Sequence, residues 1–90
     1  MDLYSLAFKP SVERDIRRLP SSMTTRVMER IEALRSAPFP PSSVKLFGAE
    51  KLYRLRVGDY RIIYEVDRST RVVIIHYARH RRDAYRRLPG

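Results

Sequence analysis

The chain has 90 residues, of which 43% are hydrophobic and 32% charged, a balance typical of a folded domain and not of a disordered segment. It has no cysteine, which excludes disulfides and thiolate metal sites, and its two histidines alone do not favour a zinc site. No apolar run approaches the roughly 18 residues of a membrane span, and the N-terminus lacks a basic leader. We therefore expect one cytoplasmic domain over residues 1–90, without a membrane contact and without a metal or organic cofactor.

The charge balance points to an anionic partner. The formal net charge is +9, and sixteen of the nineteen basic residues are arginine, whose planar guanidinium binds phosphate in a bidentate manner. Such a charge favours binding to nucleic acid or to an acidic protein. A basic surface without a partner is the alternative that composition leaves open.

The N-terminal third predicts a strand followed by a helix. Residues 3–8 (LYSLAF) have the pattern of a short strand. Pro10 suits the first turn of a helix, where its missing N–H is not needed, and Pro20 ends that helix. The apolar stripe of the helix recurs at intervals of four and three residues: Val12, Ile16 and Leu19.

A second helix is expected directly after Pro20, with Ser21 or Ser22 as its N-cap. Its apolar stripe consists of Met23, Val27, Ile31 and Leu34, and Met28 widens it. The two helices should form an antiparallel hairpin. The segment 36–43 contains three of the six prolines and predicts a linker to β-structure.

Three strands are expected after the linker. Residues 52–57 (LYRLRV) alternate between apolar and basic side chains, and Gly58-Asp59 is a two-residue hairpin turn of the primed type. Residues 60–66 form the returning strand. A turn at 67–70 then leads to a third strand over 71–78.

The hairpin turn determines which side chains share a face of the sheet. It pairs Val57 with Tyr60, Arg56 with Arg61, Leu55 with Ile62 and Arg54 with Ile63. The face that packs on the helices should then contain Tyr53, Leu55, Val57, Tyr60, Ile62 and Tyr64, together with Tyr77.

Three arginines are expected on the opposite, open face. Arg54, Arg56 and Arg61 project there, and a four-residue loop at 67–70 would place Arg61 beside His76. Like charges opposite one another destabilise a sheet, so folding alone does not explain this cluster. The cluster favours a binding site for a polyanion over a merely solvated face.

The order strand, two helices, proline-rich link and three strands resembles the RelE/ParE superfamily of toxins from type II toxin–antitoxin systems. The resemblance covers nearly the whole chain and is most specific in residues 45–64 (KLFGAEKLYRLRVGDYRIIY) and 80–85 (HRRDAY). It implies an α+β domain with about four antiparallel strands packed on a helical hairpin, in the order β-α-α-β-β-β with a short C-terminal tail or helix. It also implies that the N-terminal strand joins the edge of the sheet.

The resemblance implies two different activities, and fold alone does not choose between them. RelE-like members are ribonucleases that cut mRNA in the ribosomal A site, whereas ParE-like members inhibit DNA gyrase. Metal-free RNA cleavage by the 2′-OH requires a proton acceptor, a proton donor and cations around the scissile phosphate. We expect the RelE-like activity, a ribosome-dependent mRNA endonuclease, because the arginine cluster supplies the cations.

The residues that match positions used by RelE-like nucleases are the candidate site. We expect Arg61, His80 and Tyr85 to be catalytic, and which of His80 and Tyr85 acts as base or acid stays open. Phosphate contacts are expected from Arg54, Arg56, Arg81, Arg82 and Lys45. As alternatives, His80 is a surface residue at a strand end, Tyr85 covers the sheet edge, and Arg81 or Arg82 pairs locally with Asp83.

The resemblance also implies the partners. A cognate antitoxin should block the site, and the target should be the ribosome with its mRNA. Operator DNA is expected to be bound only through the antitoxin complex. Two other functions stay open: gyrase inhibition without nuclease activity, and a relic that binds only its antitoxin and operator.

Overall fold

The computed structural model describes residues 3–46, 48 and 51–84. Its elements in chain order are β1 (Ser5–Phe8), α1 (Pro10–Arg17), α2 (Ser21–Ala33), β2 (Ser43–Lys45), β3 (Leu52–Val57), β4 (Tyr60–Asp67) and β5 (Val72–His80). Neither helix is long and apolar enough to cross a membrane.

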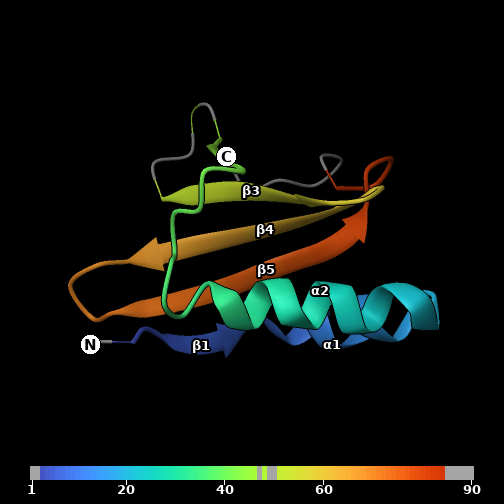
Figure 1. The fold of residues 1–90 in the computed structure, drawn as a ribbon, viewed down its shortest axis with the longest axis horizontal. Coiled ribbons are helices and arrows are strands. Elements are labelled where there is room, and N and C mark those ends of the chain that lie inside the picture. The colour runs from blue at the N-terminus through green and yellow to red at the C-terminus, as the bar shows by residue number, and fades with distance from the viewer. Residues whose placement is uncertain (1–2, 47, 49–50, 85–90) are drawn as a thin grey trace.

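The strands form one sheet in the order β1-β5-β4-β3-β2 (Figure 1). This confirms the α+β class and the position of the N-terminal strand at the sheet edge. The sheet differs in two ways from the expected sheet of about four antiparallel strands. β1 pairs with β5 in parallel, so the sheet is mixed, and the short strand β2 adds a fifth member beside β3.

The two helices lie side by side and antiparallel on one side of the sheet (Figure 1). Pro10 is the first residue of α1, as predicted, and Pro20 occupies the N-cap position of α2. The predicted serine cap is wrong, because no side chain caps α2 and its first residue is already Ser21. Met28 is 38% exposed, so it does not widen the buried stripe.

The β3–β4 hairpin has the predicted register. Arg56 lies opposite Arg61, and Leu55 lies opposite Ile62. Gly58 has φ +58, a conformation that glycine adopts without steric cost and that the first turn position of a type II′ hairpin requires. The two-residue turn therefore fixes which side chains of both strands face the helices.

The hydrophobic core lies between the helices and one face of the sheet. The predicted face is confirmed for β3 and β4, since Leu55, Val57, Ile62 and Tyr64 are buried in one cluster with both helices, and Tyr53 and Tyr60 pack against it. Tyr64 is 0% exposed, and its hydroxyl donates a 2.9 Å hydrogen bond to the Pro38 carbonyl. Burial raises the pKa of Tyr64 above its ordinary value of 10.0.

The pairing of β4 with β5 differs from the prediction in two steps. The turn lies one residue later than expected, at 68–71, because Asp67 pairs with Val72, and this shifts the pairing by two residues. A bulge then follows: Tyr64 pairs with Ile75, but Ile63 pairs with Tyr77, so His76 has no partner opposite it. Because side chains alternate along a strand, one extra residue exchanges the faces of everything after it.

Three placements change as a result. Arg61 lies opposite Arg79 and not beside His76, because the later turn and the bulge together shift the pairing by three residues. Tyr77 lies opposite Ile63, on the side of the sheet that carries Arg54, and not on the helix-facing side. Ala78 takes its place in the core and is 1% exposed.

Candidate functional site

Three arginines lie in a row across the three central strands of the sheet. Arg56 on β3 is opposite Arg61 on β4, which is opposite Arg79 on β5. We call these three residues the arginine row. Neighbouring strands are about 4.8 Å apart, so the backbone positions of the row span about 10 Å. Arg54 lies on the same face of β3, two residues before Arg56.

The row concentrates positive charge on the face that turns away from the helices. Arg56 is exposed, and within the described residues its guanidinium has no hydrogen-bond or carboxylate partner. Arg61 is half-buried, and its Nη1 donates to the carbonyl oxygens of Gly58 and Tyr60, each at 3.0 Å. These contacts hold Arg61 against the hairpin turn without neutralising its charge. The row is therefore suited to bind a polyanion.

Asp15 of α1 holds the third arginine of the row. Both of its carboxylate oxygens accept a hydrogen bond from Arg79 Nε at 3.1 Å, and Oδ2 also accepts the Ala78 N–H at 3.2 Å. β1 ends before this point because Pro10 starts α1, so the edge of β5 needs another acceptor for that buried N–H. Asp15, which is 5% exposed, supplies it and also fixes the position of Arg79.

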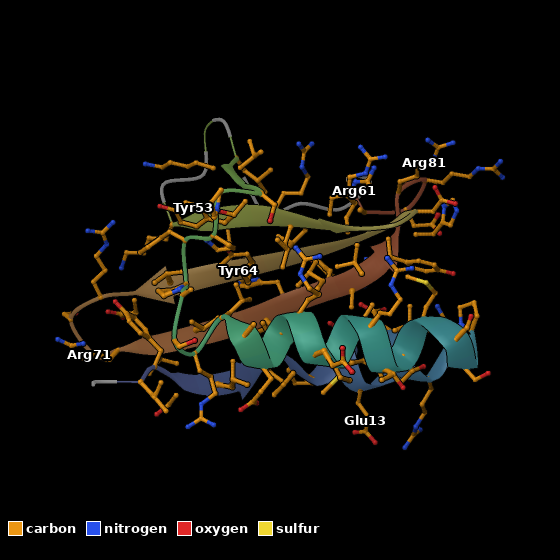
Figure 2. All side chains as sticks on the ribbon, in the orientation of Figure 1. Glu13, Tyr53, Arg61, Tyr64, Arg71 and Arg81 are labelled. Carbon is orange, nitrogen blue, oxygen red and sulfur yellow. The ribbon has the colours of Figure 1, made fainter. Side chains whose placement is uncertain are left out.

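The arginine that follows β5 lies near the row. The Arg81 N–H donates to the Asp59 carbonyl at 2.8 Å, which fastens the chain after β5 to the β3–β4 turn. Figure 2 shows Arg61 and Arg81 at the end of the sheet where this turn lies. Glu13 lies on the helix side of the molecule and points away from the sheet. Arg81 and Arg82, whose side chains are exposed, therefore follow β5 close to the Gly58-Asp59 turn, which Arg61 also contacts.

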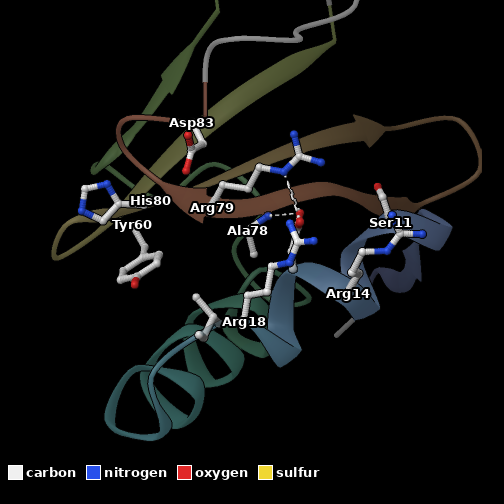
Figure 3. Close-up of a pocket in the computed structure, with 10 residues that line it drawn as sticks. Ser11, Arg14, Arg18, Tyr60, Ala78, Arg79, His80 and Asp83 are labelled. Atoms are coloured by element: carbon white, nitrogen blue, oxygen red, sulfur yellow. Dashed lines mark hydrogen bonds and ion pairs between the residues drawn. The ribbon is translucent and has the colours of Figure 1, made fainter.

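Two predicted site residues lie on the other face of the sheet. Lys45 is opposite Tyr53, which packs on the core side. His80 is opposite Tyr60, and the centres of their rings are 5.4 Å apart. Figure 3 shows His80 and Arg79 leaving β5 in opposite directions. The bulge therefore separates His80 from the arginine row, with which the sequence had grouped it.

The hydrogen bonding of His80 defines its tautomer. The backbone N–H of Arg82 donates to His80 Nδ1 at 3.2 Å, so Nδ1 carries no proton and the neutral ring has its proton on Nε2. The ring therefore presents a donor at Nε2. Nε2 is thus the ring nitrogen that can donate a hydrogen bond to an anion.

The other candidates are only partly described. Tyr85 lies outside the described residues. His76, at the bulge, has its Nε2 3.1 Å from Glu65 Oε1, which makes it a neighbour of the open face and not a member of the row. In the part of the chain that the structure describes, no group of three histidine or acidic side chains is placed to hold a metal ion.

A cleft of about 520 Å³ runs along the edge of β5 beyond the end of β1 (Figure 3). One wall is α1, which contributes Arg14 and Arg18, and the other contains Arg79 and His80. Arg79 therefore belongs both to the arginine row and to the lining of the cleft.

Comparison with known proteins identifies the family. Residues 6–85 match the family model of the ParE toxin of the type II toxin–antitoxin system parDE. This chain is a toxin of the RelE/ParE superfamily. The toxin RelE of Mycobacterium tuberculosis is 34% identical over 88 residues, which cover 96% of this chain and 90% of that relative.

Solved structures place this toxin among RelE proteins by fold. In the archaeal RelE–RelB complex from Pyrococcus horikoshii, the matched chain is 31% identical with a TM-score of 0.79, covering 91% of this toxin and 99% of that chain. In the RelB–RelE complex from Methanococcus jannaschii the identity is 27% and the TM-score 0.74, with coverage of 92% and 99%. The toxin is thus of the RelE kind.

Two residues of the site escaped the prediction from sequence. Arg79 was not selected, because its pairing with Arg61 depends on the bulge. Asp15 was not selected, although an aspartate beside the apolar stripe of α1 is a signal that sequence inspection can detect. Buried carboxylates are rarely without a charged partner, so Asp15 pointed to an arginine whose identity only the fold reveals.

Proposed function

We propose that this toxin is a ribosome-dependent mRNA endonuclease that inhibits translation. The observation that carries the proposal is the arginine row on the exposed face of the sheet, with Arg54 beside it. Guanidinium groups stabilise the charge that develops on a phosphate during cleavage. The requirement for the ribosome rests on the resemblance to RelE-like nucleases.

The proposed reaction uses the RNA's own 2′-OH and no metal ion. The 2′ oxygen attacks the adjacent phosphorus and loses its proton to a base, while the bond to the 5′ oxygen breaks and that oxygen takes up a proton. The products are a 2′,3′-cyclic phosphate and a 5′-OH end. Arg61, at the centre of the row, would stabilise the pentavalent phosphorane, and Arg54, Arg56 and Arg81 would hold neighbouring phosphates.

The proton carriers in this proposal are Tyr85 and His80. Tyr85 is retained because the motif in which it lies matches that of RelE-like nucleases. His80 requires that RNA reach around the end of β5, since its ring packs against Tyr60 on the helix-facing side. The proposal therefore assigns the larger share of proton transfer to Tyr85, and contacts from Lys45 and Arg82 lie at the margin of the bound RNA.

The proposed partners follow from the same charges and from the relatives. The neighbouring structures contain RelE with RelB, which supports a cognate antitoxin that covers the basic face. Ribosome and mRNA are the targets, which implies a cytoplasmic location. Operator DNA would be bound only through the toxin–antitoxin complex.

A reconstituted translation reaction tests the proposal. A reporter mRNA is incubated with purified toxin, either with ribosomes or without them, and the reaction without ribosomes contains EDTA. The 5′ ends of the mRNA are then mapped by primer extension. We expect cuts in register with the reading frame only when ribosomes are present. Intact mRNA in translating reactions, with the toxin shown to be folded, would remove the proposal.

Gyrase inhibition is the second candidate, because the matched family model is that of a ParE toxin. In that case the toxin acts by binding a protein and breaks no bond itself. Purified toxin would then stop DNA gyrase from supercoiling a relaxed plasmid and leave ribosome-bound mRNA intact. The Arg61→Ala variant would also keep its full toxicity.

A further inference from the structure

The cleft at the edge of β5 contains positive charge that the fold itself does not use. Arg14 and Arg18 are four residues apart on α1, so they lie on the same side of the helix and repel each other. Within the described residues, neither guanidinium has a hydrogen-bond or carboxylate partner. Arg17, between them in sequence, is paired with Glu13 at 2.6 Å instead.

The acidic groups of the cleft do not neutralise these two arginines. Asp15 is engaged by Arg79 and by the Ala78 N–H. Asp83 is exposed at the rim of the cleft. On the opposite wall, the neutral His80 ring offers its Nε2 proton as a further donor. The cleft therefore combines two guanidinium groups with a neutral donor, a set that suits successive phosphates of a nucleic-acid strand.

The cleft continues the arginine row. Arg79 is the last member of the row, and it also lines the cleft. Its Nε is held by Asp15, and in the described part of the chain its two terminal nitrogens make no hydrogen bond. A polyanion that crosses the row from Arg56 to Arg79 thus meets the cleft next, without leaving positively charged surface. This continuity favours a nucleic-acid strand over an isolated carboxylate.

We propose that this cleft is a second phosphate site for the RNA strand, in which Arg14 and Arg18 bind one backbone phosphate and the Nε2–H of His80 binds a neighbouring one. The proposal rests on the proposed function to the extent that RNA is the polyanion on the row. The Tyr60 ring, beside His80, forms an apolar wall of the same site. Arg14 and Arg18 bind substrate here and take no part in breaking the bond.

A comparison of two charge-matched double variants tests this site. R14Q/R18Q removes the two arginines of the cleft, and R17Q/R26Q removes two exposed arginines of the helices outside it. Each variant lowers the net charge equally. Affinity for a short, fluorescently labelled 2′-O-methyl RNA is measured by anisotropy over a series of salt concentrations. This RNA has no free 2′-OH, so it cannot be cleaved during the binding measurement. No ribosomes are added.

We expect R14Q/R18Q to bind the RNA about tenfold more weakly than the unchanged toxin, because charge-assisted hydrogen bonds are lost. The slope of log affinity against log salt should fall by about 0.7, the value of one phosphate contact on a single strand. R17Q/R26Q should stay within about twofold of the unchanged toxin, since neither arginine lines the cleft. Both variants should keep the thermal unfolding midpoint of the unchanged toxin.

Several results would overturn the site. Equal losses in both double variants would mean that net charge alone matters. Undetectable RNA binding by the unchanged toxin would also overturn the site. So would a cleft variant that binds RNA normally but loses affinity for the antitoxin, because the cleft would then be a protein-binding surface.

The site and the proposed function fail separately. If the unchanged toxin cuts ribosome-bound mRNA and R14Q/R18Q binds RNA normally, the nuclease stands and the second site does not. If the unchanged toxin cuts nothing, but R14Q/R18Q still loses RNA affinity relative to R17Q/R26Q, the second site stands and the nuclease does not.

Discussion

β5 has two halves that are held by different neighbours. Residues 72–75 lie between β1 and β4, and their side chains alternate between core and open face. Residues 77–80, beyond the bulge at His76, have β4 on one side and Asp15 of α1 on the other. The first half stabilises the sheet, whereas the second carries Arg79 and His80. A change of neighbour at the bulge thus marks the change from structural to candidate functional residues.

The largest effect is expected for Arg61→Ala, which removes the centre of the row beside the second half of β5. Loss of one charge-stabilising donor should lower the rate of ribosome-dependent cleavage by about 10²–10³-fold. The control is Arg17→Ala on α1, an exposed arginine paired with Glu13, which should cut at the normal rate. Normal cleavage by Arg61→Ala, measured by primer extension, would mean that the row is not the site of reaction.

Ile75→Ala tests the first half of β5. Ile75 is 0% exposed, so the cavity left behind should lower the free energy of unfolding by about 3 kcal/mol. Ile74→Ala, on the half-buried side of the same strand, should cost about 1 kcal/mol. Urea unfolding followed by circular dichroism measures both. A similar cost for the two would contradict the assignment of core and open faces.

Asp15→Ala tests what holds the second half. It removes the acceptor of the Ala78 N–H and leaves Arg79 unpaired, which should lower the free energy of unfolding by about 2 kcal/mol. Asp15→Asn keeps one acceptor oxygen and should lose less. Glu13→Ala breaks an exposed pair on the same helix and should cost under about 0.5 kcal/mol. If Asp15→Ala unfolds at the same urea concentration as Glu13→Ala, the buried contact does not hold β5.

His80→Ala tests the helix-facing side of the second half of β5, opposite the side that carries Arg79. Because His80 lies with Tyr60 and not in the arginine row, and carries the smaller share of proton transfer, we expect the cleavage rate at saturating mRNA to fall by less than about tenfold. RNA affinity should fall by about threefold, as for the loss of one neutral hydrogen bond. A loss of rate as large as that of Arg61→Ala would instead make His80 the main proton carrier, reached by RNA around the end of β5.

The smallest effect concerns Tyr64, opposite Ile75 just before the bulge. Its pKa is raised in the fold, so the folded state favours the neutral phenol. The contribution to stability is complete below pH 10.0, the ordinary value, and is lost as pH rises through the raised pKa. Tyr64→Phe should remove this decline and cost about 1 kcal/mol at neutral pH, through the lost bond to Pro38. Urea unfolding at neutral and alkaline pH measures both effects, and an unchanged alkaline decline would contradict the assignment.

The elements that sequence predicted correctly depend on short-range rules. Pro10 begins α1, and the turn at Gly58 sets the register of Arg56 against Arg61, because a two-residue loop allows only one pairing. The family resemblance added the edge position of β1, which periodicity alone did not contain. The candidate residues Arg54, Arg56 and Arg61 were therefore grouped correctly on one face before the structure was known.

The failed predictions for Tyr77 and His80 depend on where β5 meets its neighbours. The later turn and the extra residue His76 leave the apolar alternation of residues 72–75 intact, so the sequence pattern contains no sign of the change of face that follows. That change moves Tyr77 out of the core and His80 away from the row.

By itself, the sequence determined the positive charge, the order of the elements and the β3–β4 hairpin, because composition, proline positions and a two-residue turn are local properties. Only the tertiary structure decided that Arg79 completes the row and that Asp15, 64 residues earlier, holds it. The physical reason is that a buried carboxylate and an open strand edge each need a partner, and packing α1 against β5 satisfies both at once.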